Sequence, residues 1–366
     1  MTDLLTVDAL KVHFFTQSGV APAIDGIDFA IRPRETLGLV GESGSGKTMA
    51  SLAVLRLVPP PARIVGGSLR FRGHDLLALD ATAMRGLRGK SIAMIFQNPA
   101  FSLNPILSVG AQLIEILRWH ERVSRTAARD RAAELLRLVG IADPLHRLRQ
   151  FPHELSGGMK QRICIARALL CNPALILADE PTTNLDVTIQ AQILDLLEEL
   201  RERLHMAMLL VSHDMGLVAR MAHRITVVYA GRTCETADVR SIFHAPLHPY
   251  TRALLDSTPR VDHDYGHEAH PTLRTIGGRI PNLAAPPSGC RFHPRCPEAT
   301  AECAQLRPEP IQVAPGHIVS CLKRGSPGVP NAGLPTLGVP DAGLPTMELP
   351  AVGLAAMGAP PVDPTA

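Results

Sequence analysis

An octapeptide near the N-terminus has the residue types and the spacing of a phosphate-binding loop. The sequence GESGSGKT, residues 41–48, follows an apolar run at residues 36–40 and precedes an apolar helical pattern. Such a loop points several backbone N–H groups at one anion, which requires glycines wherever a side chain would block the approach. Lys47 would then reach the terminal phosphates of a nucleoside triphosphate, and the Thr48 hydroxyl would bind the bridging magnesium ion. The residues predicted to contact the nucleotide here are Gly41, Ser43, Gly44, Gly46, Lys47 and Thr48.

Two adjacent acids end the apolar segment LILADE at residues 175–180. Because a buried carboxylate is costly without a compensating cation, acids at the end of a buried strand indicate a cation site. Asp179 can hold magnesium directly or through water, and Glu180 can orient or deprotonate an attacking water molecule. Two solvated acids would be the structural alternative, and the phosphate-binding loop in the same chain argues against it.

A third candidate site lies in the segment LSGGMKQRICIARALL, residues 155–170. Ser156, Gly157 and Gly158 stand at the start of an apolar helical pattern, which is the arrangement of an anion site at a helix N-terminus. Taken alone, the segment could also be a well-capped helix.

Apolar patterns indicate the elements that must position these residues. Alternation and short apolar runs predict strands, whereas spacings of three and four predict helices. The predicted strands cover residues 4–15, 23–31, 36–40, 174–178, 208–211 and 225–229, and the predicted helical regions cover residues 105–139 and 187–204. Because strands and helices alternate, the sequence predicts an α/β fold with a largely parallel sheet.

The length and composition limit the classes of protein to which this chain can belong. With 366 residues, the chain has room for one large domain plus an appendix, or for two modest domains. A formal net charge of +3 and a charged fraction of 19% argue against a dedicated nucleic-acid-binding protein. Asp3 and Asp8 argue against a signal peptide, and polar residues and prolines interrupt the uncharged stretch at residues 91–114. We therefore expect a cytosolic protein without a transmembrane segment.

The last part of the chain changes character. Residues 271–322 contain many prolines and several cysteines, and GVPNAGLPTL from Gly328 is echoed by GVPDAGLPTM from Gly338. Such a segment buries too little apolar surface to offset its chain entropy. We expect residues 325–366 to form an extended, disordered tail.

Four of the seven cysteines cluster in this C-terminal region. They are Cys290, Cys296, Cys303 and Cys321, in the spacing C-x5-C-x6-C-x17-C. Cytosolic proteins rarely use disulfides, so four thiolates on short loops indicate an iron–sulfur cluster or a zinc ion. Structural zinc usually has tighter C-x2–4-C pairs, and cysteines without a ligand are a third possibility. Cys164, Cys171 and Cys234 fall in predicted core elements, where cysteine acts as a small buried hydrophobe.

The order of these motifs resembles that of the ATP-binding cassette (ABC) ATPases. That family carries LSGGQ between the phosphate-binding loop and the LILADE strand, and here Met159 replaces the glutamine. In IFQNP, Gln97 looks like the glutamine that links metal and water to the membrane partner. In LLVSHD, His213 looks like the histidine that contacts the γ-phosphate. Phe14 matches the aromatic residue that stacks on adenine.

The resemblance extends to the segment Asn184-Leu185-Asp186, which looks like the family's D-loop. Asn184 departs from the small residue commonly found there, which leaves the fine geometry of that loop open. Asp186 is carried over as a nucleotide-site residue.

This resemblance implies an ABC cassette at residues 1–256, which is an α/β P-loop fold with a mixed, largely parallel sheet. It also implies an antiparallel β subdomain and a helical subdomain at about residues 98–160. The implied ligands are ATP and Mg2+, with Gln97 joining Thr48 and Asp179 around the metal.

In that family two cassettes meet head to tail, so the phosphate-binding loop of one faces Ser156 and Gly158 of the other across ATP. This sequence contains one cassette. We therefore expect it to dimerise with itself or with a paralogue in order to hydrolyse ATP.

Two segments beyond the cassette resemble the C-terminal extension of peptide importer ATPases, the oligopeptide, dipeptide and nickel group. They are PLHPYTRALL from Pro246 and IPNLAAPPSGCRFHPRC from Ile280. The resemblance implies an extension at residues 257–324 with a [4Fe–4S] cluster on the four cysteines, as a structural staple or as a redox sensor.

The implied function is the ATPase subunit of an importer for peptides, or for nickel or another small solute, on the cytoplasmic face of the membrane. The implied partners are two permeases, a second cassette ATPase and, indirectly, an extracytoplasmic solute-binding protein, but no nucleic acid. A soluble ATPase of translation or DNA repair would usually have two cassettes, and an exporter would lack the extension. An iron–sulfur regulator with vestigial ATP binding would not keep every catalytic position.

Overall fold

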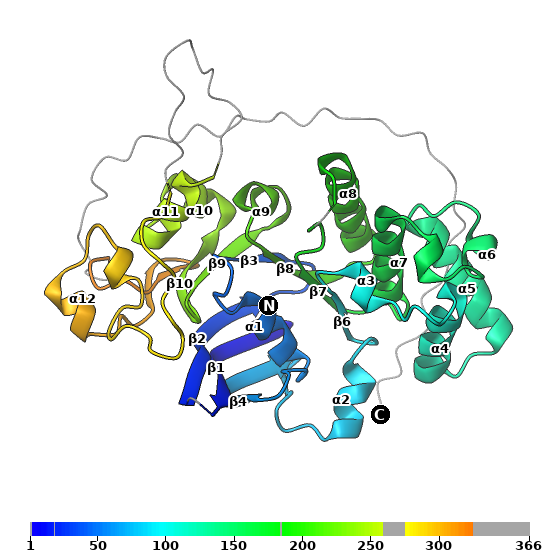
Figure 1. The fold of residues 1–366 in the computed structure, drawn as a ribbon, viewed down its shortest axis with the longest axis horizontal. Helices are drawn as coiled ribbons and strands as arrows, with labels where there is room; N and C mark the ends of the chain where they lie inside the picture. The colour runs from blue at the N-terminus through cyan, green and yellow to red at the C-terminus, as the bar shows by residue number, and fades with distance from the viewer. Residues whose placement is uncertain (1, 18, 184, 259–274, 325–366) are drawn as a thin grey trace, which may run out of the picture. The chain divides into compact units, whose positions relative to one another are not determined.

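The structure, a computed structural model, describes residues 2–17, 19–183, 185–258 and 275–324 (Figure 1). The prediction of a disordered tail at residues 325–366 lies outside the described residues, and so does the departure at Asn184.

An eight-stranded sheet forms the centre of the described chain, in the order β11-β12-β10-β9-β3-β8-β7-β6. Its strands are β3 (Thr36–Val40), β6 (Ile92–Ile95), β7 (Leu175–Asp179), β8 (Ala207–Ser212), β9 (Arg224–Tyr229), β10 (Arg232–Asp238), β11 (Ile311–Ala314) and β12 (His317–Val319). The five strands from β9 to β6 are parallel, and the three strands beyond β9 are antiparallel. This arrangement confirms the predicted mixed, largely parallel sheet.

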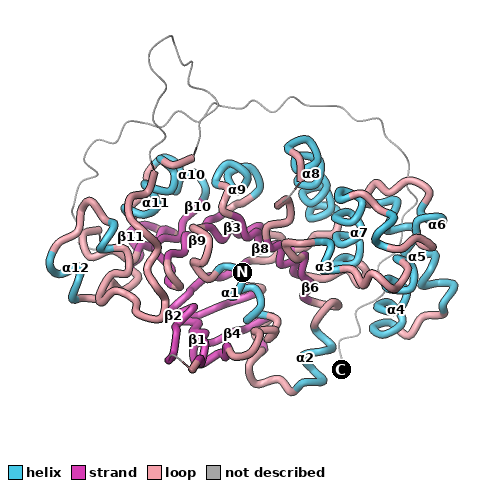
Figure 2. The backbone as a smooth tube through the Cα atoms, in the orientation of Figure 1, coloured by secondary structure: helices cyan, strands magenta, loops and turns pink. Residues whose placement is uncertain are grey.

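The parallel strands are buried on both faces, which explains their continuous apolar runs. In β7, Leu175 and Leu177 pack into one core cluster, whereas Ile176 and Ala178 pack into the other. The cluster that contains Ile176 and Ala178 includes residues of the helices α7 (Gly157–Leu169), α8 (Val187–Arg203) and α9 (Met215–Met221). The other includes residues of α1 (Lys47–Val54) and of a second sheet on the opposite side (Figures 1 and 2).

The second sheet has four antiparallel strands in the order β2-β1-β4-β5. They are β1 (Leu5–Thr16), β2 (Gly19–Ile31), β4 (Ala62–Phe71) and β5 (His74–Asp75). The alternating sequence of residues 4–15 and 23–31 predicted the first pair. β2 begins four residues earlier than expected, because residues 19–22 still pair with β1.

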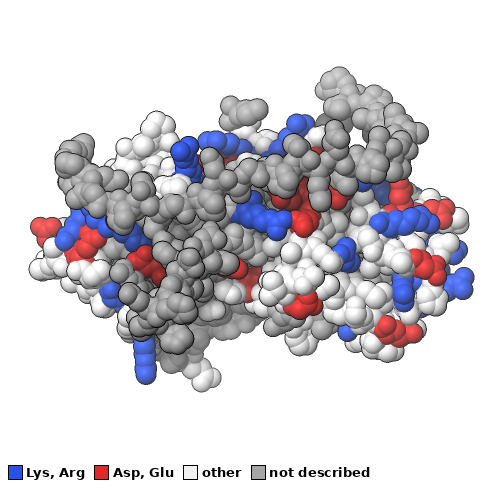
Figure 3. All heavy atoms as spheres, turned by 90° about the horizontal axis from the view of Figure 1, so that it is seen from above, with Lys and Arg blue, Asp and Glu red and all other residues white. Residues whose placement is uncertain are grey.

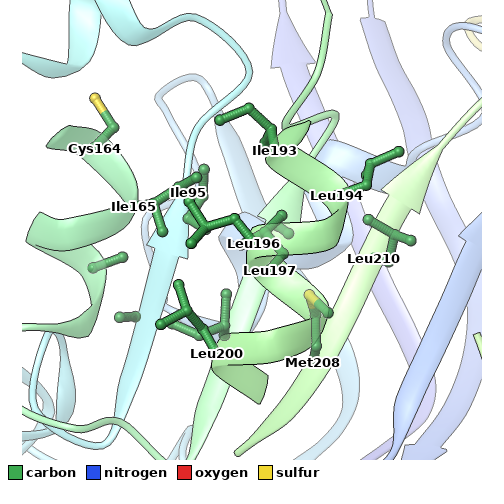
Figure 4. Packing of buried hydrophobic residues seen from close by; sticks show 14 of the residues in the cluster. Ile95, Cys164, Ile165, Ile193, Leu194, Leu196, Leu197, Leu200, Met208 and Leu210 are labelled. Atoms are coloured by element: carbon green, nitrogen blue, oxygen red, sulfur yellow. The ribbon is translucent and has the colours of Figure 1, made fainter. Parts of the chain in front are cut away.

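Helix α8 shows how the predicted apolar face packs. Ile193, Leu196, Leu197 and Leu200 are buried against the parallel strands, near Ile95 of β6 and both Met208 and Leu210 of β8 (Figure 4). Asp186 caps the helix, because its carboxylate accepts the Ile189 N–H at 2.9 Å.

The helical insert follows β6. It contains α3 (Pro99–Ser102), α4 (Val109–Glu121), α5 (Arg125–Leu138) and α6 (Pro144–Arg147), and the short helix α2 (Ala81–Leu87) precedes β6. The hydroxyl groups of Ser108 and Ser124 cap α4 and α5. The predicted helical region at residues 105–139 is thus two helices, separated where Arg122 adopts a left-handed conformation.

After β10 come α10 (Val239–His244), α11 (Pro249–Asp256) and α12 (Ala301–Gln305), with a short 3-10 turn at residues 293–295 between α11 and α12. Another 3-10 turn, at residues 152–154, precedes α7. Tyr250, Leu254 and Leu255 of α11 are buried in the core. The extension was expected to be loop-rich, but β11 and β12 extend the main sheet next to β10. These strands have only four and three residues, too few to show an alternating pattern.

Within the described ranges, no helix combines the length and the apolar character needed to cross a membrane.

Candidate nucleotide-binding site

The loop at residues 41–48 joins β3 to α1. Lys47 is only 5% exposed, and its Nζ donates hydrogen bonds to the carbonyl oxygens of Gly41 at 2.7 Å and Glu42 at 3.0 Å. Burial lowers the pKa of Lys47, although the nearby Glu180 and Asp179 act in the opposite direction. At Gly41 a Cβ atom would lie 2.1 Å from the Val228 carbonyl oxygen, so only glycine fits. The loop therefore holds an ammonium group at the start of a helix.

A carboxylate and a hydroxyl meet beside this ammonium group. The Thr48 Oγ1 donates to Asp179 Oδ1 at 3.0 Å, and Asp179 ends β7 with a 2% exposed side chain. Burial raises the pKa of Asp179 to about 6. An oxygen pair of this kind suits Mg2+, which prefers oxygen ligands.

The carboxylate of Glu180 is held from three directions. Gln97 Nε2 donates to Glu180 Oε2 at 2.7 Å, and Thr183 Oγ1 donates to the same oxygen at 2.9 Å. His213 Nδ1 lies 3.0 Å from Glu180 Oε1. Burial works to raise the pKa of Glu180, but the hydrogen bonds from His213 and Thr183 outweigh it and lower that pKa. The side chain is therefore an ionised carboxylate, which can accept a proton.

The structure thus brings together residues that lie far apart in the sequence, at the ends of β7 and β8, at the start of α1 and in the loop after β6. The predicted residues that meet here are Lys47, Thr48, Gln97, Asp179, Glu180 and His213. Thr183 was not among the predicted residues, and only its place three residues after Glu180 could have suggested it. Nor was Gln161, whose Nε2 donates to the Pro181 carbonyl oxygen at 2.6 Å and so ties α7 to this group.

Other predicted site residues lie elsewhere. Ser156 caps α7 by accepting the Met159 N–H at 3.3 Å, and both Ser156 and Gly157 are exposed to solvent. Gly158 follows on the same helix, and a Cβ atom there would lie 3.3 Å from Ile189. Phe14 is half-buried on β1. Within the described part of the chain, no hydrogen bond joins Ser156 or Asp186 to the group around Glu180.

The four C-terminal cysteines line one small cavity, together with His248 and Phe292. The Cys290 N–H donates to the Cys303 carbonyl oxygen at 2.8 Å. The thiols of Cys290, Cys296 and Cys321 have raised pKa values, chiefly through burial and further through neighbouring thiols. Nevertheless, the described residues contain no group of three or more His, Cys, Asp or Glu side chains placed to hold a metal ion. The structure therefore gives the expected [4Fe–4S] cluster a shared cavity but no preformed metal site.

The part of the chain that holds the nucleotide-binding loop is similar to known proteins. The family profile described as ABC transporter matches residues 24–183. A solved dimeric ATP-binding cassette, in a post-hydrolysis state with bound ADP and Pi, aligns with a TM-score of 0.58 and 26% sequence identity. The alignment covers 64% of this chain and 99% of that one. The fold and the site thus define an ABC ATPase, as the order of the motifs predicted.

The dipeptide transport ATP-binding protein DppD of Escherichia coli (strain K12) is 45% identical over 334 residues, which are 91% of this chain and 99% of that protein. DppD of Bacillus subtilis (strain 168) is also 45% identical, over 88% of this chain and 95% of that protein. A profile described as the oligopeptide/dipeptide transporter C-terminal region matches residues 234–303. The chain belongs to the ABC transporter family, in its oligopeptide/dipeptide group.

Proposed function

We propose that this chain is the ATP-hydrolysing subunit of an importer that takes up peptides, bound peripherally to the cytoplasmic face of the membrane. One observation carries the proposal. The ionised Glu180, the buried Lys47 and the Thr48–Asp179 pair meet at one site, in a chain that also has the oligopeptide/dipeptide C-terminal region. Relatives at 45% identity are named dipeptide transport proteins.

In this proposal Lys47 and the loop glycines would hold the ATP phosphates, and Thr48, Asp179 and Gln97 would hold Mg2+. Glu180 accepts a proton from the attacking water. His213 holds the Glu180 carboxylate and the γ-phosphate. These roles follow from the charges and hydrogen bonds around Glu180 and from the family resemblance.

The exposed N-terminus of α7 points to a second cassette. Ser156, Gly157 and Gly158 present a helix N-terminus to solvent, away from the hydrogen bonds of the Glu180 group. We propose that they contact ATP bound by the partner ATPase, with Asp186 at the same interface. ATP would then be sandwiched between two cassettes, and its hydrolysis would reopen the sandwich.

An apolar surface near Gln97 is proposed to bind the permease subunits. Phe101 of α3 is 89% exposed and Ile106 is 79% exposed, only four and nine residues after Gln97. Large apolar side chains that are exposed close together mark an interaction surface. Because Gln97 contacts Glu180, a permease bound here would be linked to the catalytic carboxylate. The solute-binding protein would act through the permeases.

A nucleic-acid partner is not part of this proposal. On the face shown in Figure 3, the visible Lys and Arg side chains are interspersed with Asp and Glu. This mixture of charge agrees with the net charge of +3 and differs from the continuous basic surface typical of nucleic-acid binding.

The proposed function predicts which proteins accompany the chain in its own host. The tagged chain, purified from gently solubilised membranes, should bring down two multi-span permeases and a second cassette ATPase, identified by mass spectrometry. Phe101→Ser should reduce permease recovery about tenfold, because it removes an exposed apolar contact. Val20→Ser, at an exposed apolar position on β2, is the matched control and should recover the permeases normally. Recovery of ribosomes or nucleic acid, without permeases, would overturn the proposal.

We also propose that the four C-terminal cysteines together bind a metal centre, with a [4Fe–4S] cluster as the favoured occupant and zinc as the second. Support comes from the resemblance and from the single cavity that the four thiols line. Thiolates are the usual ligands of both occupants. The thiols would have to rearrange around the metal. A bound centre would cross-link a short, proline-rich segment that has little core of its own.

Metal analysis tests this second proposal. Protein purified without oxygen should contain about four irons and four sulfides per chain, and Cys296→Ser should lose most of both. Cys171→Ser, at a buried cysteine outside the cavity, should keep them. About one zinc per chain without sulfide would identify zinc instead. Folded protein without iron, sulfide or zinc would show that these cysteines bind no metal.

A further inference from the structure

The segment between Cys290 and Cys296 reaches the nucleotide-binding loop directly. Arg295 donates to both carboxylate oxygens of Glu42, at 2.7 Å and 3.0 Å, and its side chain is only 4% exposed. It also donates to the carbonyl oxygen of Gly277 at 2.8 Å. A bidentate, charge-assisted pair of this kind fixes both position and orientation. The pair joins the extension to residue 42 of the loop.

Glu42 is held through its backbone as well. Its N–H donates to the Tyr250 hydroxyl oxygen at 2.8 Å, and its carbonyl oxygen accepts from Lys47 Nζ at 3.0 Å. Arg295, Tyr250 and Lys47 therefore converge on one loop residue. A shift of Glu42 would move a carbonyl oxygen that places the Lys47 ammonium group.

The residues that hold Glu42 are themselves supported by packing. The Tyr229 and Tyr250 rings lie 4.6 Å apart, and Phe292 contacts both, at 5.1 Å and 5.3 Å between ring centroids. The Arg295 guanidinium lies 5.6 Å from the centre of the Tyr229 ring. This aromatic cluster of Tyr229, Tyr250 and Phe292 is buried, so the segment that carries Arg295 packs through Phe292 against the cassette.

The charges of the two side chains are a second reason why the Arg295–Glu42 pair matters for phosphate binding. Glu42 places a carboxylate on a loop whose ligand would be a polyanion, and an unpaired negative charge there would repel phosphate. Arg295 neutralises that carboxylate and holds it in a defined place. The conflict between Glu42 and an anionic ligand exists only when Arg295 is absent.

We propose that Arg295 and Tyr250 are positioning residues for ATP binding, which act through Glu42, so that the C-terminal extension sets the affinity of the cassette for ATP. The inference rests on the proposed function, because it takes residues 41–48 as the ATP site. It adds a role for the extension in the nucleotide site, besides any metal that the cysteines hold.

Titration of the full chain with a fluorescent ATP analogue and Mg2+ tests the proposal. Arg295→Ala should raise Kd about tenfold, because it leaves Glu42 unpaired and free to move. Tyr250→Phe, which removes only one hydroxyl, should raise Kd three- to fivefold. Adding Glu42→Gln to Arg295→Ala should recover part of the lost affinity, since the unpaired carboxylate is gone. A residue that only stabilised the fold would lower the unfolding temperature without this recovery.

Arg324→Ala is the matched control, because Arg324 is an arginine of the same extension that pairs with Glu298 at 2.7 Å, away from the loop. Its Kd should stay within twofold of the wild-type value. If Arg295→Ala does not fold, Tyr250→Phe decides the test. Wild-type affinity in folded Arg295→Ala and Tyr250→Phe would overturn the proposal. Wild-type affinity in Lys47→Ala would instead overturn the ATP site itself.

Discussion

Replacing Glu180 with glutamine should abolish ATP hydrolysis by the assembled transporter while leaving ATP binding intact. Glutamine keeps the size of the side chain and one oxygen to accept the hydrogen bonds from Gln97 and Thr183. It cannot accept a proton from water, and loss of a general base typically costs about 10²- to 10⁴-fold in rate. We expect phosphate release to fall by at least about 100-fold, measured on the purified complex in lipid, with Kd for ATP changed less than threefold.

Glu202→Gln provides the control for this prediction. Glu202 is also a glutamate in the second half of the chain, but it is exposed at the end of α8 and forms an ion pair with Arg201, away from the nucleotide-binding loop. Its removal should leave the hydrolysis rate unchanged. Normal turnover by Glu180→Gln would mean that another group activates the water, and Glu180 would lose its proposed catalytic role.

Replacing Lys47 with alanine should remove most of the affinity for ATP. The ammonium group is buried beside two carbonyl oxygens and is the positive charge that the loop offers to the phosphates. Hydrogen bonds to charged groups contribute about 1.5 to 3 kcal/mol each. With two phosphates contacted, we expect Kd to rise by about 100-fold or more.

The measurement is the same titration with a fluorescent ATP analogue, combined with circular dichroism to show that the variant is folded. Lys90→Ala removes an exposed lysine outside the site and should bind like the wild type. A Kd within threefold of the wild-type value for Lys47→Ala would contradict the proposed phosphate contacts.

The sequence predicted those parts of the site that are contiguous. The loop at residues 41–48 and the acid pair Asp179-Glu180 each lie in one short segment, so their residue types and spacing were enough to propose them as site residues. Gln97 and His213 were predicted only through the family resemblance, because a lone glutamine or histidine has no local pattern. In the structure both contact Glu180.

Contacts between distant segments could not be predicted. Glu42 and Arg295 are 253 residues apart, and neither position has a pattern that names its partner. The hydrogen bond between Tyr250 and the loop depends on the packing of α11 against the end of the sheet, which no local pattern shows. In the fold, α8 was predicted to within one residue, whereas the region at residues 105–139 is two helices and β4, β5, β6, β10, β11 and β12 were missed.

The position of β11 affects how readily copies of the chain aggregate. β11 is the outermost strand on its side of the main sheet, and all four of its residues are exposed. An outermost strand with free N–H and C=O groups can recruit a strand from another molecule and start aggregation. Pro308, Pro310 and Pro315 flank this strand, and proline has no N–H to donate. The stretch open to such pairing is therefore only four residues long, which protects the chain from strand-to-strand association at high concentration.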